Sequence, residues 1–317
     1  MKWIFERFGK RSLPTSELYG LSPRFPVIGK SRRKMGEAFA VGASMVAVRL
    51  PMAVAGRNPD FWLIDDDLDA LVNDPSVPSG YRQRIGAAWK DSVSCHQWDN
   101  LKAVIVPSDK LAEIHGQLGR KVIRLDPSWP IPMDMPSAGS EGGKEVVALG
   151  TGSHAGDIGL LRTALENPSR TWNFNHFMGK HAPAWLERLP RIRSHPPLPW
   201  ASYKKSLPLM KFDVCVYPCR ATSLNEARSC NKIMEHAMIG APALYSSCVP
   251  FADHVKAISG DLLVDGDWTA AIEQLIQSGA ARRQMAEKSH RYALELAANA
   301  SASQAALWDS IARNDMP

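Results

Sequence analysis

The sequence predicts an α/β fold made of two domains. Short apolar runs alternate with helical patterns along most of the chain, which is typical of βαβ units with parallel strands. The stretch 128–143 has no periodicity, is rich in Pro, Gly and Ser, and separates two such series. With 317 residues, the chain is long enough for two cores. We therefore expect two Rossmann-like domains facing across a ligand-binding cleft.

The expected domains are unequal in length. We assign a basic arm to residues 1–35, a short N-terminal α/β domain to 36–137, a linker to 138–144 and a C-terminal α/β domain with tail helices to 145–317. The expected strands are 39–48, 61–64, 103–106, 122–125, 146–149, 171–177, 212–217, 243–246 and 262–264. The expected helices are 81–99, 109–116, 158–166, 267–277 and 280–313, together with one that follows Ser229.

The net charge of +6 is concentrated in the arm. Nine Lys or Arg against two Glu give residues 1–35 a net charge of +7, so the other 282 residues sum to −1. A neutral body argues against a nucleic-acid partner. The first twelve residues interleave basic side chains with Trp3, Phe5 and Phe8, a pattern that suits an anionic membrane surface. A disordered or locally packed N-terminus is the alternative.

Other features bear on location and cofactors. The run 38–56 is apolar, but Arg49 and Pro51 interrupt it, so a buried strand and turn are favoured over a membrane span. The five cysteines form no CxxC pair and no metal-ligand spacing, which argues against a metal site. Their odd count, without a recognisable secretion signal, suggests reduced thiols. We expect a cytoplasmic protein, with peripheral binding to the inner membrane as an option that the arm permits, and no cofactor.

The stretch 225–244 predicts an anion-binding helix followed by a buried strand. Ser229 is a suitable N-cap, and Gly240 suits the left-handed position after the last turn. The amides of a helix N-terminus favour an anion, and Arg228 and Lys232 add positive charge there. Glu235 lies one turn further on and could accept hydrogen bonds from sugar or ribose hydroxyls.

Several strings in the second half, in this order, resemble the retaining glycosyltransferases of family 4, which have the GT-B fold. The strings are Gly150–Asp157 (GTGSHAGD), Leu198-Pro199-Trp200-x-x-Tyr203 with Phe212-Asp213-Val214, Asn225-x-x-Arg228-Ser229-x-x-Lys232-x-x-Glu235, Gly240-x-Pro242 and Asp265-Gly266. In the first half, Trp62–Leu68 (WLIDDDL) is similar to a string in one branch of the family. The usual family pattern has a Glu eight residues before Glu235, where this chain has Ala227.

The resemblance implies transfer of a sugar from a nucleotide-sugar to a saccharide acceptor without a metal. The acceptor would be lipid-linked, in the biosynthesis of a bacterial surface polysaccharide such as lipopolysaccharide. The implied catalytic residues are His154 and Glu235. The implied donor-binding residues are Gly152, Ser153, Asn225, Glu226, Arg228, Ser229, Lys232 and Glu235. For Asp157, the N-cap of helix 158–166 is the favoured role.

Two alternatives remain open at this stage. Asp65, Asp66 and Asp67 follow an apolar strand and could hold Mg²⁺ or Mn²⁺ on a diphosphate in a metal-dependent transferase. Alternatively, the chain could be a catalytically degenerate GT-B-like protein that binds a glycan or a partner as a scaffold of polysaccharide assembly, since Ala227 replaces a Glu. The donor base, the sugar, the linkage and the oligomeric state are not predicted.

Overall fold

The computed structural model describes residues 13–31, 35–93, 101–137, 139, 144–150 and 152–315. It divides the chain into two compact units, each of which is described by itself. Unit 1 comprises the described parts of 1–68, 84–128 and 299–317, and unit 2 those of 69–83 and 129–298. The expected domains were single segments, whereas these units are assembled from separated ones. Residues 1–12 of the expected arm and most of the expected linker lie outside the described residues.

Unit 1 contains a six-stranded mixed sheet in the order β1-β2-β3-β4-β5-β6. Its strands are β1 (Val27–Lys30), β2 (Glu37–Val41), β3 (Ser44–Val48), β4 (Phe61–Leu63), β5 (Ala103–Val106) and β6 (Val122–Arg124). The strands from β3 to β6 are parallel, and β1 and β2 pair antiparallel. The single strand expected at 39–48 is wrong: it is a hairpin that turns at Gly42, where φ is +58°. A side chain there would also meet the backbone oxygen of Ala312 at 2.3 Å, so only glycine fits.

Helices cover this sheet, and the last of them, at the C-terminal end of the chain, packs in the same unit. They are α2 (Pro14–Leu18), α4 (Ser79–Val93, of which 84–93 belong to unit 1), α5 (Asp109–Gln117) and the last part of α12 (Gly279–Arg313). Ser108 caps α5 by accepting a hydrogen bond from the amide of Leu111. In α12, Gln304 and Trp308 donate to the backbone oxygens of Leu18 and Tyr19. The carbonyl groups at the C-terminal end of α2 therefore accept hydrogen bonds from side chains distant in sequence.

Unit 2 contains a six-stranded parallel sheet in the order β12-β11-β10-β7-β8-β9. Its strands are β7 (Glu145–Ala148), β8 (Asn173–His176), β9 (Ile192–Ser194), β10 (Val214–Tyr217), β11 (Ala243–Ser246) and β12 (Leu263–Val264). The first strand in sequence, β7, lies next to the fourth, β10, and the order reverses between them. In open parallel sheets, ligands bind at the carboxyl ends of the two strands beside this switch point.

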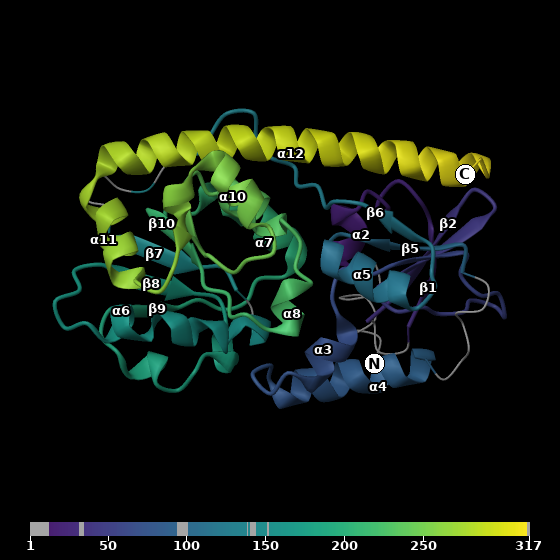
Figure 1. Ribbon diagram of the computed structural model, residues 1–317, viewed down its shortest axis with the longest axis horizontal. Coiled ribbons are helices and arrows are strands. Elements are labelled where there is room, and N and C mark those ends of the chain that lie inside the picture. Colours follow the sequence, from purple (N-terminus) through teal and green to yellow (C-terminus); the bar gives the residue numbers. More distant parts are fainter. Residues whose placement is uncertain are drawn as a thin grey trace. The chain divides into compact units, whose positions relative to one another are not determined.

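The helices of unit 2 flank its strands, as Figure 1 shows. They are residues 69–73 of α3 (Leu68–Asn73), residues 79–83 of α4, α6 (Arg162–Glu166), α7 (Trp200–Ser206), α8 (Ser223–Glu226), α9 (Asn231–Ala237), α10 (Ala252–Ile258), α11 (Trp268–Gln277) and the first part of α12. Short 3₁₀ turns precede α6: η1 (Gly152–His154) and η2 (Asp157–Leu161). The remaining 3₁₀ turns are η3 (Gly179–His181), η4 (Leu186–Arg188), η5 (Leu207–Leu209) and η6 (Gly260–Leu262).

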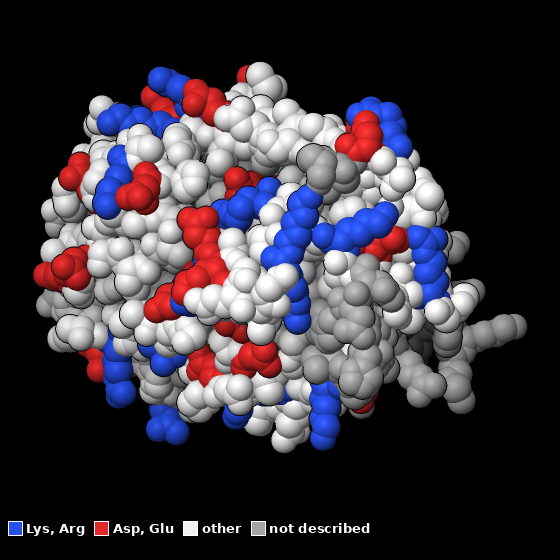
Figure 2. All heavy atoms as spheres, turned by 45° about the vertical axis from the view of Figure 1, so that its right-hand side comes forward, with Lys and Arg blue, Asp and Glu red and all other residues white. Residues whose placement is uncertain are grey.

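The apolar run 38–56 is the segment for which a membrane span was weighed. It forms two buried strands, β2 and β3, and the segment after them, which agrees with the preference for buried structure over a membrane span. Within the described part of the chain, no helix is both long and apolar enough to cross a membrane. On the face shown in Figure 2, acidic and basic side chains are interspersed among uncharged ones.

Candidate functional site

The candidate site of unit 2 lies at the carboxyl ends of β7 and β10. The loop after β7 leads through η1 to His154 and then to Asp157, and the loop after β10 leads through Arg220 to α8. Because β7 and β10 are neighbours in the sheet, these two loops meet although more than sixty residues separate them. The site is therefore produced by the strand order of the parallel sheet.

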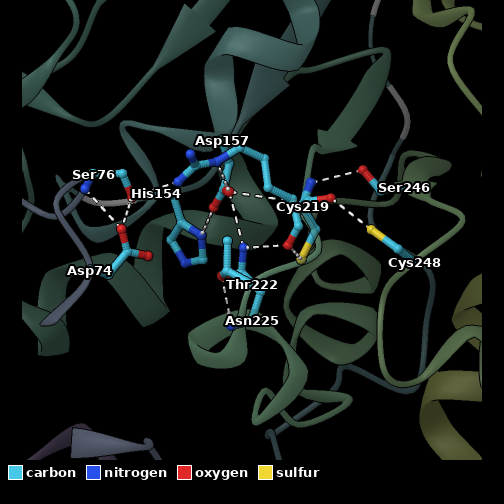
Figure 3. Close-up of polar contacts among 10 residues, drawn as sticks. Asp74, Ser76, His154, Asp157, Cys219, Thr222, Asn225, Ser246 and Cys248 are labelled. Atoms are coloured by element: carbon cyan, nitrogen blue, oxygen red, sulfur yellow. Dashed lines mark hydrogen bonds and ion pairs between the residues drawn. The ribbon is translucent and has the colours of Figure 1, made fainter. Parts of the chain in front are cut away.

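Asp157 is the centre of a buried hydrogen-bond network (Figure 3). Its Oδ1 accepts from the backbone amide of Arg220 at 3.2 Å, from Nε of Arg220 at 3.3 Å and from Nδ2 of Asn225 at 3.0 Å. Its Oδ2 lies 3.3 Å from Nδ1 of His154. Burial raises the pKa of Asp157, but these hydrogen bonds and the nearby charges outweigh it and hold the pKa below the usual value. The carboxylate is therefore ionised at neutral pH.

His154 lies against the carboxylate of Asp157 and the ring of Tyr217, whose centroid is 5.4 Å away. Burial lowers its pKa, and the charges of Arg228 and Lys232 lower it further, against the opposing effect of Asp157. The imidazole is therefore neutral at pH 7. With Nδ1–H directed at the carboxylate, which is the tautomer that the network favours, Nε2 carries a lone pair.

Arg220 is held from a second direction by the segment between α3 and α4. Its Nη2 donates to Oγ of Ser76 at 2.5 Å. Ser76 in turn donates through Oγ and its amide to Oδ1 of Asp74, at 2.6 and 2.8 Å. A Cβ on Gly156 would lie 2.5 Å from Cβ of Ser76 and 2.7 Å from Nη2 of Arg220, so only a glycine lets these groups approach.

The predicted helix after Ser229 is real but begins later than expected. The segment forms two short helices, α8 and α9, with Arg228 between them. The N-cap of α9 is Cys230, without a side-chain cap, and Ser229 Oγ instead accepts from the amide of Asn231 at 3.4 Å. The N-cap role predicted for Ser229 is therefore wrong, because the backbone turns again before α9 begins.

The end of this segment is as predicted. Gly240 has φ +75°, and a Cβ there would lie 2.3 Å from the backbone oxygen of Pro136. The strand expected at 243–246 is β11.

Glu235 is buried in α9 and is already paired within the protein. Its Oε1 accepts from the hydroxyl of Tyr203 in α7, and its Oε2 pairs with Nζ of Lys232. Lys232 also lies over the ring of Tyr217, 5.9 Å from its centroid. The pKa of Tyr203 is raised well above its usual value by burial and by the adjacent carboxylate. Lys232 and Glu235 thus belong to a second polar cluster in α9, which meets the Asp157 network at the ring of Tyr217.

The structure brings some predicted site residues into this network and leaves others at its edge. Asn225 and His154 bond directly to Asp157. Gly152 is packed on His181, since a Cβ there would lie 2.8 Å from the imidazole. Ser153 and Arg228 are half-buried, and Glu226 is exposed.

Three residues of the hydrogen-bond network were not predicted from the sequence as part of the site: Asp157, Arg220 and Ser76. We expected Asp157 to be the N-cap of a helix, but it is the first residue of η2, and Gly156 is the N-cap, without a side-chain cap. Arg220 carried no recognisable signal. Ser76 lies in the first half of the sequence, far from the strings between Gly150 and Glu235 that indicated the donor site. The signal that could have identified Asp157 is its place after β7, beside the strand that precedes Asn225.

Asp65 and Asp66, which suggested a metal-dependent alternative, belong to unit 1 and have protein partners. Asp65 Oδ2 accepts from Oγ1 of Thr15 at 2.6 Å, and Asp66 pairs with Arg49 at 3.3 Å. Burial and the charge of Asp66 raise the pKa of Asp65. Within the described ranges, no group of three His, Cys, Asp or Glu side chains is arranged to hold a metal ion.

Comparison with known proteins identifies the fold. No protein-family model matches this chain, and no curated protein matches its sequence. Sucrose-phosphate synthase from Thermosynechococcus elongatus is similar in structure, with a TM-score of 0.52, 13% identity, and coverage of 80% of this chain and 68% of its own. WaaG, a glycosyltransferase involved in lipopolysaccharide biosynthesis, has a TM-score of 0.52, 13% identity and coverage of 78% and 72%.

A variant of TarM from S. aureus, solved with fondaparinux, alpha-GlcNAc-glycerol and UDP, gives a TM-score of 0.55 at 13% identity. The match covers 81% of this chain but 52% of TarM, so the chain spans about half the length of that protein. At such low identities these similarities establish the fold alone. The chain has two Rossmann-like α/β units of the kind found in GT-B glycosyltransferases.

Proposed function

We propose that this protein is a glycosyltransferase that moves a sugar from a nucleotide-sugar donor to a saccharide acceptor. The observation that carries the proposal is the network around Asp157, because it lies at the switch point of a parallel sheet and has cationic residues beside it. The GT-B fold and the family-4-like strings between Gly150 and Glu235 support the same class of activity. UDP in the TarM structure is the type of ligand that we infer here.

The proposed chemistry follows from the charges at the site. When a nucleotide-sugar reacts, negative charge builds on the departing diphosphate, and fixed cations stabilise it in the transition state. We assign this role to Arg228 and Lys232, with backbone amides around Gly152 and Ser153 contributing where the chain approaches closely. The neutral imidazole of His154 would accept a hydrogen bond from a sugar hydroxyl through Nε2. We propose a retaining transfer that uses no metal.

Glu235 would orient the donor and hold Lys232 beside the diphosphate. Substitution Glu235→Gln keeps the side-chain volume and an acceptor for Tyr203 but removes the charge that pairs with Lys232. We expect kcat/KM to fall at least tenfold, about 1.4 kcal/mol of transition-state stabilisation. Glu166→Gln is the matched control, because Glu166 also pairs with a cation but is exposed on α6. Equal rates for wild type and Glu235→Gln would remove Glu235 from the site.

The first experiment is a search for the donor. A panel of nucleoside diphosphates and nucleotide-sugars is tested for an increase in Tm, because a ligand that binds only the folded state stabilises it by mass action. We expect one nucleotide to stabilise the protein in both its diphosphate and its sugar-linked form. A panel without any stabilising compound would contradict the proposal and favour a degenerate GT-B-like scaffold protein.

The finer proposals concern the acceptor and the membrane. We assign acceptor binding to unit 1 and propose a lipid-linked saccharide acceptor in the biosynthesis of a bacterial surface polysaccharide. The +7 charge of residues 1–35 supports a cytoplasmic protein that binds the anionic inner leaflet, at about 1 kcal/mol for each basic residue near the surface. Removal of residues 1–12 should release the protein from anionic liposomes in a co-sedimentation assay. Equal binding with and without them, or equal binding to neutral lipid, would contradict the membrane proposal.

A further inference from the structure

We propose that Arg220 is a third cationic ligand of the donor diphosphate, and that Asp157 and Ser76 fix its guanidinium group for that contact. The inference rests on the proposed function, because it deepens the description of the same site. It adds one binding residue and one positioning residue that the sequence did not indicate. Both residues belong to unit 2, so the inference depends only on contacts within that unit.

The guanidinium of Arg220 is held on two sides. Nε donates to Asp157 Oδ1 at 3.3 Å, and Nη2 donates to Ser76 Oγ at 2.5 Å. Its third nitrogen, Nη1, forms no hydrogen bond with any described residue, and the side chain is 36% exposed. An arginine fork carries five N–H donors, so most of them remain available to an anion. Because its orientation is already fixed, little conformational entropy is lost when a phosphate binds.

The place of Arg220 in the fold is the place where a diphosphate is expected. The residue follows β10 by three positions, at the carboxyl edge of the sheet and beside the switch point. Its backbone oxygen accepts from Asn225 Nδ2 at 3.0 Å, which fixes the loop that carries it. The thiol of Cys219 is buried, which raises its pKa to about 12, and the charges of Arg228 and Arg220 both oppose this increase. Arg220 and Arg228 therefore both lie close enough to the Cys219 thiol for their charges to influence it.

Ser76 acts on the diphosphate only through Arg220. Its hydroxyl donates to Asp74, so its oxygen lone pairs face Nη2 of Arg220, as Figure 3 shows for the Ser76–Asp74 contact. The backbone of Gly156 lies close to both side chains, since a Cβ there would lie 2.5 Å from Cβ of Ser76 and 2.7 Å from Nη2 of Arg220. Ser76 is therefore a positioning residue, and its loss should weaken anion binding less than the loss of Arg220 itself.

The test measures phosphate recognition separately from nucleoside recognition. The ligands are the nucleoside diphosphate that most stabilises the wild-type protein, its nucleoside and inorganic pyrophosphate, and the method is isothermal titration calorimetry on the full chain. The variants are Arg220→Gln, Arg220→Lys and Ser76→Ala. Arg193→Gln is the matched control, because Arg193 pairs with Glu145 at 2.9 Å in the same unit but at the opposite end of β7.

We expect Arg220→Gln to weaken binding of the diphosphate and of pyrophosphate at least tenfold, while nucleoside affinity stays within twofold. Arg220→Lys should give an intermediate loss, because it keeps the charge but not the fork. Ser76→Ala should weaken diphosphate binding two- to fivefold, and Arg193→Gln should change nothing. A structural role alone would lower nucleoside and diphosphate affinity together.

Two negative results have different meanings. If the wild-type protein binds no nucleoside diphosphate, the proposed function itself is contradicted. If the wild-type protein binds one and Arg220→Gln binds it with the same affinity, only the inference about Arg220 is overturned. Circular dichroism at 25 °C establishes that each variant is folded. Should Arg220→Gln fail to fold, unchanged diphosphate affinity in both Arg220→Lys and Ser76→Ala overturns the inference.

Discussion

Each unit places an aspartate beyond the carboxyl end of a parallel strand, and the two aspartates differ in their surroundings. Asp65 in unit 1 accepts a side-chain hydrogen bond from Thr15, and its buried Oδ1 has no hydrogen-bond partner among the described residues. Asp157 in unit 2 receives hydrogen bonds from His154, Arg220 and Asn225. The pKa of Asp65 is raised by burial and by Asp66, whereas that of Asp157 is lowered in spite of its burial.

The comparison shows that burial does not decide the charge of a carboxylate. Burial acts in the same direction on both residues, towards the neutral acid. The donors at Asp157 and the like charge of Asp66 beside Asp65 make the difference, because each donor directed at the ionised form stabilises it and a neighbouring carboxylate disfavours it. A permanently charged Asp157 can hold Arg220, while a carboxyl such as Asp65 is poorly suited to that role. This is a physical reason to place the site in unit 2.

The largest expected effect on this comparison comes from Asp157→Asn. The amide keeps the shape of the side chain but leaves His154 and Arg220 without an anionic acceptor. We expect a loss of about 2 kcal/mol in the free energy of unfolding at pH 7, a value reduced for the partial exposure of Arg220. Urea unfolding monitored by circular dichroism measures it.

Asp65→Asn is the paired substitution of the same chemistry in unit 1. Because its Oδ1 has no partner and burial disfavours its charge, the change should stay within about 0.5 kcal/mol. Similar losses for the two variants would mean that donor number does not distinguish the two aspartates.

A smaller expected effect distinguishes Asp65 from Asp157 by the way each changes the free energy of unfolding with pH. The folded-state pKa of Asp65 is raised, so between pH 3.8 and that pKa the folded protein binds a proton that the unfolded chain has lost. Its stability therefore falls as the pH rises through this window. The folded-state pKa of Asp157 is lowered, so its stabilisation is complete above pH 3.8 and is lost only below it.

The measurement compares each Asn variant with wild type by urea unfolding between pH 7 and pH 4. The stability of wild type relative to Asp65→Asn should rise as the pH is lowered in this range. The stability of wild type relative to Asp157→Asn should stay constant. Parallel profiles for the two variants would show that the aspartates titrate alike in the folded protein.

Local structure was predicted from the sequence where an apolar run has clear ends. The strands at 103–106 and 243–246 are β5 and β11, with the expected bounds, because Pro107 and Pro242 limit them. The run 39–48 is apolar on both sides of its turn, so periodicity alone could not reveal the hairpin at Gly42. The short edge strand at 192–194 lies in a polar stretch and gave no apolar signal.

The candidate site was predicted only in part, because its contacts cross long distances in sequence. Asn225 and His154 were singled out from the local strings that contain them. Their shared partner, Asp157, depends on β7 lying beside β10, which a strand order supplies and a local pattern does not. Ser76 comes from a segment 144 residues away from Arg220, and nothing in the sequence links the two.

The exposed thiol of Cys248 is a suitable position for a fluorescent label near the candidate site. Its Sγ lies 2.9 Å from the backbone oxygen of Cys219, the residue before Arg220, and the side chain is exposed. Cys215, Cys219 and Cys230 are buried, and burial raises the pKa of the first two thiols, so they react slowly with maleimides. In a Cys95→Ser background, a fluorophore on Cys248 would therefore report events at the end of β10 while the core thiols stay unlabelled.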